Sequence, residues 1–229
     1  MLGAVIIVFR EILEAGLIIG IVLAATKGVP RRGLWVSLGV GLGVAGACLV
    51  AFFAGFIGQL FQGSGQELFN ASVLFTAVLM LAWHNIWMTA NGRKISEDVR
   101  ALGAEVASGN KKLFAITAVV AIAVLREGSE VVLFLYGLSA AEDWKSILVG
   151  GMTGLLMGAA ATALLYFGLL AIPVRYFFSI TTLLVTFLAA GLAAQAVSFL
   201  QQGNYVESWS TPIWDTSRFL PENGWIGRL

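Results

Sequence analysis

Two short stretches place an arginine and two glutamates inside otherwise apolar sequence. Residues 10–14 read REILE and residues 126–130 read REGSE. An α-helix advances by about 100° per residue, so the three charged residues of each stretch share one side of a helix. A charge that faces lipid costs roughly 2.5–3.5 kcal/mol. We therefore expect the two charged faces to point inward, toward each other or toward a water-filled cavity near the middle of the membrane.

Each stretch carries two carboxylates for one guanidinium, so the pair holds a surplus of negative charge. The alternative is a set of buried salt bridges that only locks two helices together. Such pairs rarely stabilise a protein more than an apolar replacement does, and one-to-one pairing would need a single glutamate per arginine. We interpret the four glutamates as ligands of a cation and the two arginines as supporting residues: Glu11, Glu14, Glu127 and Glu130, with Arg10 and Arg126.

The residue types restrict the cation. Carboxylates suit hard ions, whereas soft ions prefer sulfur ligands. The chain has one histidine, His84, and one cysteine, Cys48. A bis-histidine haem, a histidine-rich zinc or copper site and a thiolate cluster are thereby excluded. The residues alone leave Fe³⁺, Mn²⁺, Ca²⁺ and other hard ions open.

The composition predicts the elements that must hold these residues. Of 229 residues, 59% are hydrophobic and 12% are charged, whereas about a quarter of the residues of a soluble domain are charged. A bilayer core is spanned by about 20 apolar residues. Six apolar windows predict an all-α integral membrane protein with six transmembrane helices, at residues 2–25, 34–57, 68–90, 113–138, 147–171 and 177–200.

The windows form two sets of three with matching features. The first and fourth windows carry the charged stretches, and the second and fifth carry ladders of small residues, which we interpret as close-packing surfaces. Two successive three-helix units have opposite orientations, so we expect two inverted repeats with the site at their interface. The ladders are Gly39, Gly43, Ala47 and Ala51 in one window and Gly150, Gly154 and Gly158 in the other.

This pattern predicts four regions. Residues 1–90 form the first repeat and residues 113–200 the second. Residues 91–112 form a charged cytoplasmic loop with helical spacing in part, and residues 201–229 form an extracytoplasmic aromatic tail. Most basic residues outside the two stretches fall in the connections after the first, third and fifth windows, which predicts an N-terminus outside by the positive-inside rule.

Two further residues are candidates for the ion pathway. His84, expected toward the cytoplasmic end of its helix, could be an exit-side ligand or a proton relay. A hydrogen-bonded packing histidine is the alternative. Gln195 could offer its amide oxygen to the ion, although membrane glutamines also bond neighbouring helices.

The paired Arg-Glu-x-x-Glu stretches resemble the high-affinity iron permease family, the oxidase-dependent iron transporters. The segments AVLREGSEVVLFLYG and LAAGLAAQAVSFLQQ are similar to its bacterial branch. The resemblance implies a multi-pass permease of the cytoplasmic (inner) membrane that imports Fe³⁺ with the motif glutamates as ligands. It also implies a seventh helix, apparently missing here.

The same resemblance implies no enzymatic activity and no cofactor, since iron is the transported substrate. Expected partners are the lipid bilayer and periplasmic or surface proteins that oxidise or handle iron, with no nucleic acid. The alternatives are a permease for another hard or heavy divalent metal, such as Mn²⁺ or Pb²⁺, and a structural membrane subunit with buried salt bridges.

Overall fold

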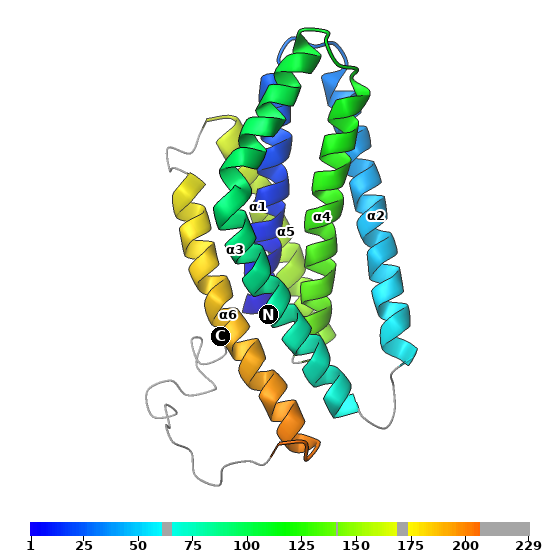
Figure 1. The fold of residues 1–229 in the computed structure, drawn as a ribbon, viewed down its shortest axis with the longest axis vertical. Coiled ribbons are helices and arrows are strands. Elements are labelled where there is room, and N and C mark those ends of the chain that lie inside the picture. The colour runs from blue at the N-terminus through cyan, green and yellow to red at the C-terminus, as the bar shows by residue number, and fades with distance from the viewer. Residues whose placement is uncertain (61–65, 141, 169–173, 207–229) are drawn as a thin grey trace.

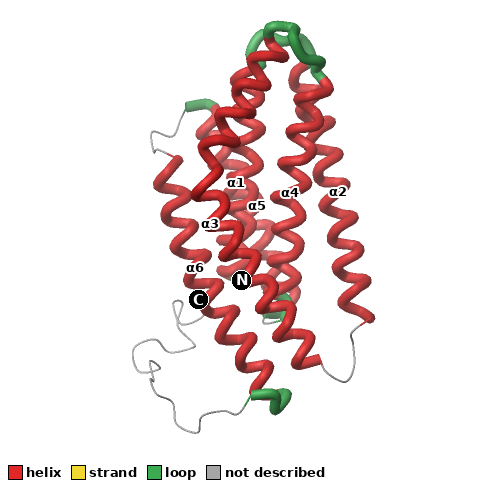
Figure 2. Tube along the Cα trace, viewed as in Figure 1, coloured by secondary structure: helices red, strands yellow, loops and turns green. Residues whose placement is uncertain are grey.

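The fold is a bundle of long helices. The structure, a computed structural model, describes residues 1–60, 66–140, 142–168 and 174–206. Within these ranges the regular elements are six helices and no strand (Figures 1 and 2). They are α1 (Leu2–Ala25), α2 (Arg32–Leu60), α3 (Gln66–Ala107), α4 (Phe114–Leu138), α5 (Trp144–Tyr166) and α6 (Val174–Gln202). The prediction of an all-α fold is confirmed.

The two helices that carry the charged stretches lie at the centre. α1 contacts α3, α4, α5 and α6 along the bundle, and α4 contacts α1, α2 and α3. α2 packs mainly on α4, α5 packs mainly on α1, and α3 packs on α6. If α1, α2 and α3 are exchanged with α4, α5 and α6, the same three pairings result. The pairings therefore agree with a repeat. The inverted repeat itself stays a prediction.

The small-residue ladders lie where the outer helices meet the inner ones. A Cβ atom built on Gly154 of α5 would lie 2.6 Å from the carbonyl oxygen of Val5 in α1. A Cβ atom on Gly43 of α2 would lie 2.8 Å from the carbonyl oxygen of Ala121 in α4. Since both neighbours are backbone atoms, they cannot move aside as a flexible side chain would. The interpretation of the ladders as close-packing surfaces is confirmed for their glycines.

The outer helices have the length and composition of membrane spans. Four segments meet this description: Arg32–Phe56, Gln66–Ala107, Trp144–Tyr166 and Ser179–Gln202. They expose large apolar side chains such as Phe52, Leu79 and Phe187. Contiguous apolar surface of this extent is not typical of soluble monomers. α1 and α4 carry the charged residues and are covered by these outer helices.

The charged segment at residues 91–112 differs from the expected loop. α3 continues without a break to Ala107, so most of the segment extends the helix. Val99 and Val106 of this extension are buried in an apolar cluster with Val22 of α1 and Val120 of α4. The helical spacing noted in the sequence is therefore confirmed, and the connection to α4 is short. In the predicted tail, residues 207–229 lie outside the described part of the chain.

Side-chain hydrogen bonds close two of the helix ends that the structure describes. The Arg32 guanidinium donates to the carbonyl oxygen of Leu23 at 2.8 Å, at the C-terminal end of α1. At the start of α5, the Ser146 backbone N–H donates to the Asp143 carboxylate at 2.9 Å. Such bonds satisfy backbone groups that have no partner within the helix.

Candidate metal centre

The two charged stretches meet in the interior of the bundle. α1 supplies Glu11, α4 supplies Glu127 and Glu130, and α3 supplies His84. Each of these side chains offers one ligand atom, and the four atoms lie within 4.8 Å of one another. The two charged faces therefore point toward each other, as their helical spacing predicts.

The first stretch is sealed from the surface. The Nε of Arg10 lies 3.0 Å from Oε1 of Glu14, and its Nη1 lies 3.8 Å from Oε1 of Glu11. The Arg10 side chain is only 2% exposed, and both glutamates are as deeply buried. Three charged groups thus share a space without water contact, where an uncompensated charge is very costly.

The second stretch is more open. The Nε of Arg126 lies 3.2 Å from Oε1 of Glu130 and 3.9 Å from Oε1 of Glu127. The guanidinium carbon also lies 4.2 Å from the ring centroid of Trp87, a cation–π contact. The Arg126 side chain is 34% exposed. The two stretches are alike in sequence, but the arginine of the second is far more exposed than the arginine of the first.

His84 connects the two stretches. Its Nδ1 contacts Oε2 of Glu130 in the second stretch. Its Nε2 lies 3.4 Å from Oε2 of Glu14 and 4.0 Å from Oε2 of Glu11 in the first. His84 is 3% exposed, and it is the chain's single histidine. An imidazole in this position can donate to a carboxylate or bind a metal through one ring nitrogen.

Several polar atoms of the site make no hydrogen bond of good geometry among the described residues, although some of them take part in the close contacts given above. They are Nε and Nη1 of Arg10, both carboxylate oxygens of Glu11 and of Glu14, one oxygen each of Glu127 and Glu130, and both ring nitrogens of His84. Buried polar atoms are nearly always hydrogen-bonded, so each exception calls for an explanation. Convergent oxygen and nitrogen donors of this kind can hold a cation.

The structure differs from the sequence-based expectation in which residues it gathers. Glu11, Glu127 and Glu130 converge, while Glu14 lies beside Arg10 and His84. His84 was expected toward the end of its helix, on the exit side. It lies instead among the glutamates, where α3 packs against α1 and α4, and α3 extends well beyond it to Ala107.

Gln195 is half-buried on α6, which packs chiefly on α3. Its place on an ion path stays a prediction.

One sequence signal pointed to His84, since a single histidine amid apolar residues of a predicted membrane helix is an unusual polar residue there.

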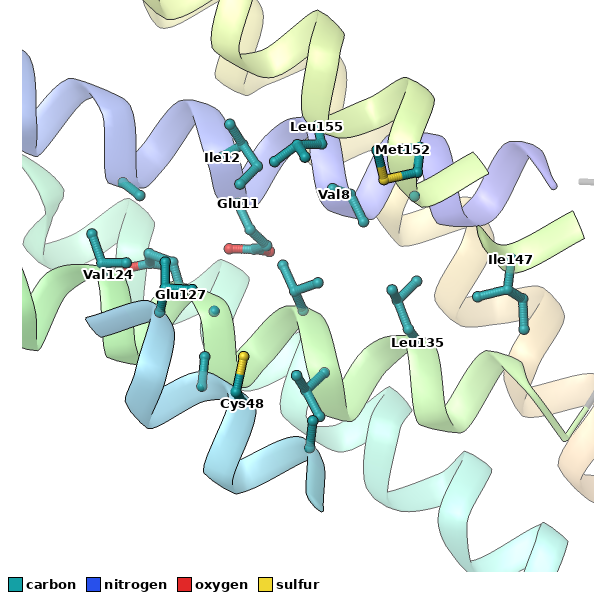
Figure 3. Close-up of a pocket in the computed structure, with 18 of the residues that line it drawn as sticks. Val8, Glu11, Ile12, Cys48, Val124, Glu127, Leu135, Ile147, Met152 and Leu155 are labelled. Carbon is teal, nitrogen blue, oxygen red and sulfur yellow. The ribbon is translucent and has the colours of Figure 1, made fainter. Parts of the chain in front are cut away.

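Two cavities reach the site between different sets of helices. One, of about 320 Å³, is lined by Met80, Trp83 and Trp87 of α3 with Arg126 and Glu130 of α4, and His84 lies at its wall. The other, of about 370 Å³, lies among α1, α2, α4 and α5. Figure 3 shows the Glu11 and Glu127 carboxylates at one side of this second cavity, among apolar side chains.

Comparison with known proteins gives the family. The model of the iron permease FTR1 family matches residues 1–228. The ferrous iron permease EfeU of Escherichia coli O6:K15:H31 (strain 536 / UPEC) is 32% identical over 234 residues, which cover 98% of this chain and 82% of that relative. The ferrous iron permease EfeU of Yersinia pestis is 30% identical over 231 residues, which cover 97% of this chain and 80% of that relative. No solved structure matches the chain.

These matches confirm the resemblance drawn from the two charged stretches. The chain is a multi-pass membrane transporter and not an enzyme, and iron is its cargo rather than a resident cofactor. It belongs to the iron permease FTR1 family.

Proposed function

We propose that the chain imports ferric iron and that the ion is held between α1, α3 and α4 during transport. The ligands in this proposal are Glu11, Glu127 and Glu130, with Glu14 and His84 at the same site. The observation that carries the proposal is the convergence of four ligand atoms within 4.8 Å. Small metal ions bind oxygen ligands at about 2.0–2.2 Å, so ligands on opposite sides of an ion lie about 4.2 Å apart. The ligand atoms would need to move closer together by only a few tenths of an ångström to contact one ion.

The arginines keep the empty site stable. Arg10 pairs with Glu14 at 3.0 Å, and Arg126 pairs with Glu130 at 3.2 Å. An incoming cation replaces part of this pairing, and the guanidinium groups then compete for the same carboxylates during release. Because α5 packs on α1 and α2 packs on α4, each central helix can move together with its outer partner. Rocking of these two pairs would open the site to one side and then to the other.

Fe²⁺ is the second candidate cargo, and His84 favours it. Carboxylates alone suit a hard trivalent ion, whereas imidazole is a common ligand of divalent iron. The printed names of the matched Escherichia coli and Yersinia pestis relatives also specify ferrous iron. Four glutamates against two arginines leave two negative charges with His84 neutral, which a divalent ion balances. A trivalent ion leaves one positive charge.

We further propose that the end with the connections after α1 and α3 faces the cytoplasm, so that the N-terminus lies outside. Figure 1 shows these two connections together at one end of the bundle. They carry Lys27, Arg31, Lys111 and Lys112, and basic residues favour the cytoplasmic side. In a bacterium the membrane would be the inner one. Labelling of cysteines introduced at Lys27 and at Lys145 in intact cells tests this orientation.

Uptake of radioactive iron by cells tests the site. The variants are Glu11→Gln, Glu14→Gln, Glu127→Gln, Glu130→Gln and His84→Ala, each with its protein level in the membrane measured. The matched control is Glu105→Gln, because this glutamate is about half exposed and lies far along α3. We expect the site variants to lose uptake at normal protein levels. Normal uptake by both Glu11→Gln and Glu127→Gln would refute the proposed site.

The oxidation state and metal are tested separately. Uptake is compared under a reductant, with and without a membrane-impermeant Fe²⁺ chelator, and under oxidising conditions with ferric citrate. Uptake that survives the chelator and is blocked by excess Fe³⁺, but not by Mn²⁺ or Pb²⁺, supports the ferric proposal. Uptake that requires the reductant and stops with the chelator replaces it with the ferrous one.

A further inference from the structure

An apolar groove leads from the outside of the bundle to two of the site carboxylates. Its volume is about 370 Å³, within the range of small-molecule pockets, and its walls come from α1, α2, α4 and α5. Cys48 on α2 and Met152 on α5 line it and are exposed on the bundle surface. Figure 3 shows Cys48 on the α2 side and Met152 on the α5 side of the groove, with Glu11 and Glu127 together toward one end.

The groove exists because the outer helices pack on different inner helices. α2 lies on α4 and α5 lies on α1, so the space between α2 and α5 is not closed by their own contact. Small residues border this space, including Ala47, Ala51 and Gly151. A Cβ atom on Gly151 would meet only the tips of Leu135 and Val8, at 3.8 and 3.9 Å, so the position leaves room for a ligand.

The inner end of the groove is negatively charged and under-bonded. Glu11 is 1% exposed, and neither of its carboxylate oxygens has a hydrogen-bond partner among the described residues. Glu127 is 3% exposed, and its Oε2 is likewise without a partner. Nη1 of Arg10 lies 3.8 Å from Oε1 of Glu11, and Nε of Arg126 lies 3.9 Å from Oε1 of Glu127. Both distances are longer than a hydrogen bond. A cation is one partner that could pair with these carboxyl groups.

We propose that the groove binds a hydrophobic monocation, entering from the lipid side with its charged head against Glu11 and Glu127 and its apolar body along the walls. The walls favour an apolar body because they pack against it and offer it few polar partners. The buried carboxylates favour a positive head because charge pairing in a low-dielectric site is strong. A neutral molecule of the same shape would leave the carboxylates unpaired. The site is thus an inhibitor site reached through the membrane, separate from the aromatic cavity beside Trp87.

The test uses the chain's single cysteine as the reporter and needs no transport. Full-length protein in lipid vesicles is treated with N-ethylmaleimide, and alkylation of Cys48 is followed by mass spectrometry. The probe is decyltrimethylammonium, whose charge does not depend on pH, and decanol is the neutral control. At about ten times its dissociation constant, the bound cation should slow alkylation about tenfold. Decanol at the same membrane concentration should have little effect.

Variants separate the charged end from the apolar walls. Glu11→Gln and Glu127→Gln should each weaken the protection by the cation without changing alkylation in its absence. Gly151→Leu should fill the groove and reduce the protection, whereas Gly41→Leu, with no atom near its Cβ position, should leave it intact.

Equal protection by decanol, full protection in both glutamine variants, or a Cys48 that does not react in the untreated protein would each overturn the proposal. Because alkylation is measured without iron, the outcome is independent of whether the four glutamates carry the metal in transport. If both proposals hold, the cation should also inhibit iron uptake competitively.

Discussion

Replacement of His84 by alanine tests the most specific feature of the site, a single imidazole that contacts both charged stretches. The Nε2 atom lies 3.4 Å from Glu14, and Nδ1 contacts Glu130. His84→Ala removes one donor from the group of four and leaves the carboxylates around it without this partner. The fold should tolerate this change better than the loss of Arg10, whose guanidinium pairs with the buried Glu14 at 3.0 Å.

The magnitude follows from the contacts that are lost. A hydrogen bond to a charged group contributes about 1.5–3 kcal/mol. With about 1.4 kcal/mol for each tenfold change in affinity, the loss of one such contact weakens metal binding by about tenfold to about 100-fold. Loss of a group that orients metal ligands has effects of the same size. We therefore expect the dissociation constant for iron to rise by one to two orders of magnitude.

The assay is direct binding to purified full-length protein in detergent. Trp83 and Trp87 line the cavity beside Glu130, so their fluorescence should be quenched when iron binds. The titration is performed with Fe²⁺ without oxygen and with ferric citrate, and thermal unfolding is recorded for each variant. Ile86→Ala is the matched control, because this residue lies on the same helix and is 70% exposed on the outer surface.

The reasoning would fail if His84→Ala bound iron within about twofold of the unchanged protein while Glu127→Gln did not bind it. In that case the histidine only fills space between the two stretches. A tenfold or larger loss with an unchanged melting temperature would instead support a ligand role. A loss of binding that follows a fall in melting temperature would assign His84 to packing.

Three further changes test the packing, the charge balance and a helix end. Gly154→Leu should destabilise the protein by about 1–3 kcal/mol through overpacking against the α1 backbone, with Gly41→Leu near neutral in the same thermal unfolding assay. Arg10→Met should lower the yield of folded protein in size-exclusion chromatography more than Arg126→Met, because Arg10 is 2% exposed and Arg126 is 34% exposed. A backbone N–H at the start of α5 lowers the pKa of the Asp143 carboxyl, so its stabilising effect is present above the unfolded pKa of about 3.9 and is lost as pH falls through the lower folded value. The difference in melting temperature between the unchanged protein and Asp143→Ala should therefore shrink in acid; a constant difference from neutral to acid pH would contradict this.

The helices were predictable because their signal is local. The window at residues 2–25 coincides with α1, and the other windows overlap α2 to α6 with shifted ends. A run of about 20 apolar residues has few alternatives to a helix in a membrane, since every backbone polar group must be satisfied within the segment. The extension of α3 to Ala107 was missed as part of the bundle. The extension is mostly polar in sequence, so its two buried residues, Val99 and Val106, do not stand out as an apolar pattern.

The candidate site was predictable in part for the same reason. Helical spacing alone places Arg10, Glu11 and Glu14 on one face, and the cost of exposing charge to lipid turns that face inward. The sequence by itself thus determined which side chains share a face and that the two faces must be enclosed.

Only the tertiary structure decided what the faces meet. The entry of His84 into the glutamate cluster depends on how α3 crosses α1 and α4, and nothing in the spacing of its own residues encodes that crossing. The same holds for the burial of Arg10 against the exposure of Arg126, and for the groove that ends at Glu11. Periodicity acts along one helix, whereas these features arise from side chains of three or four helices that pack together at once.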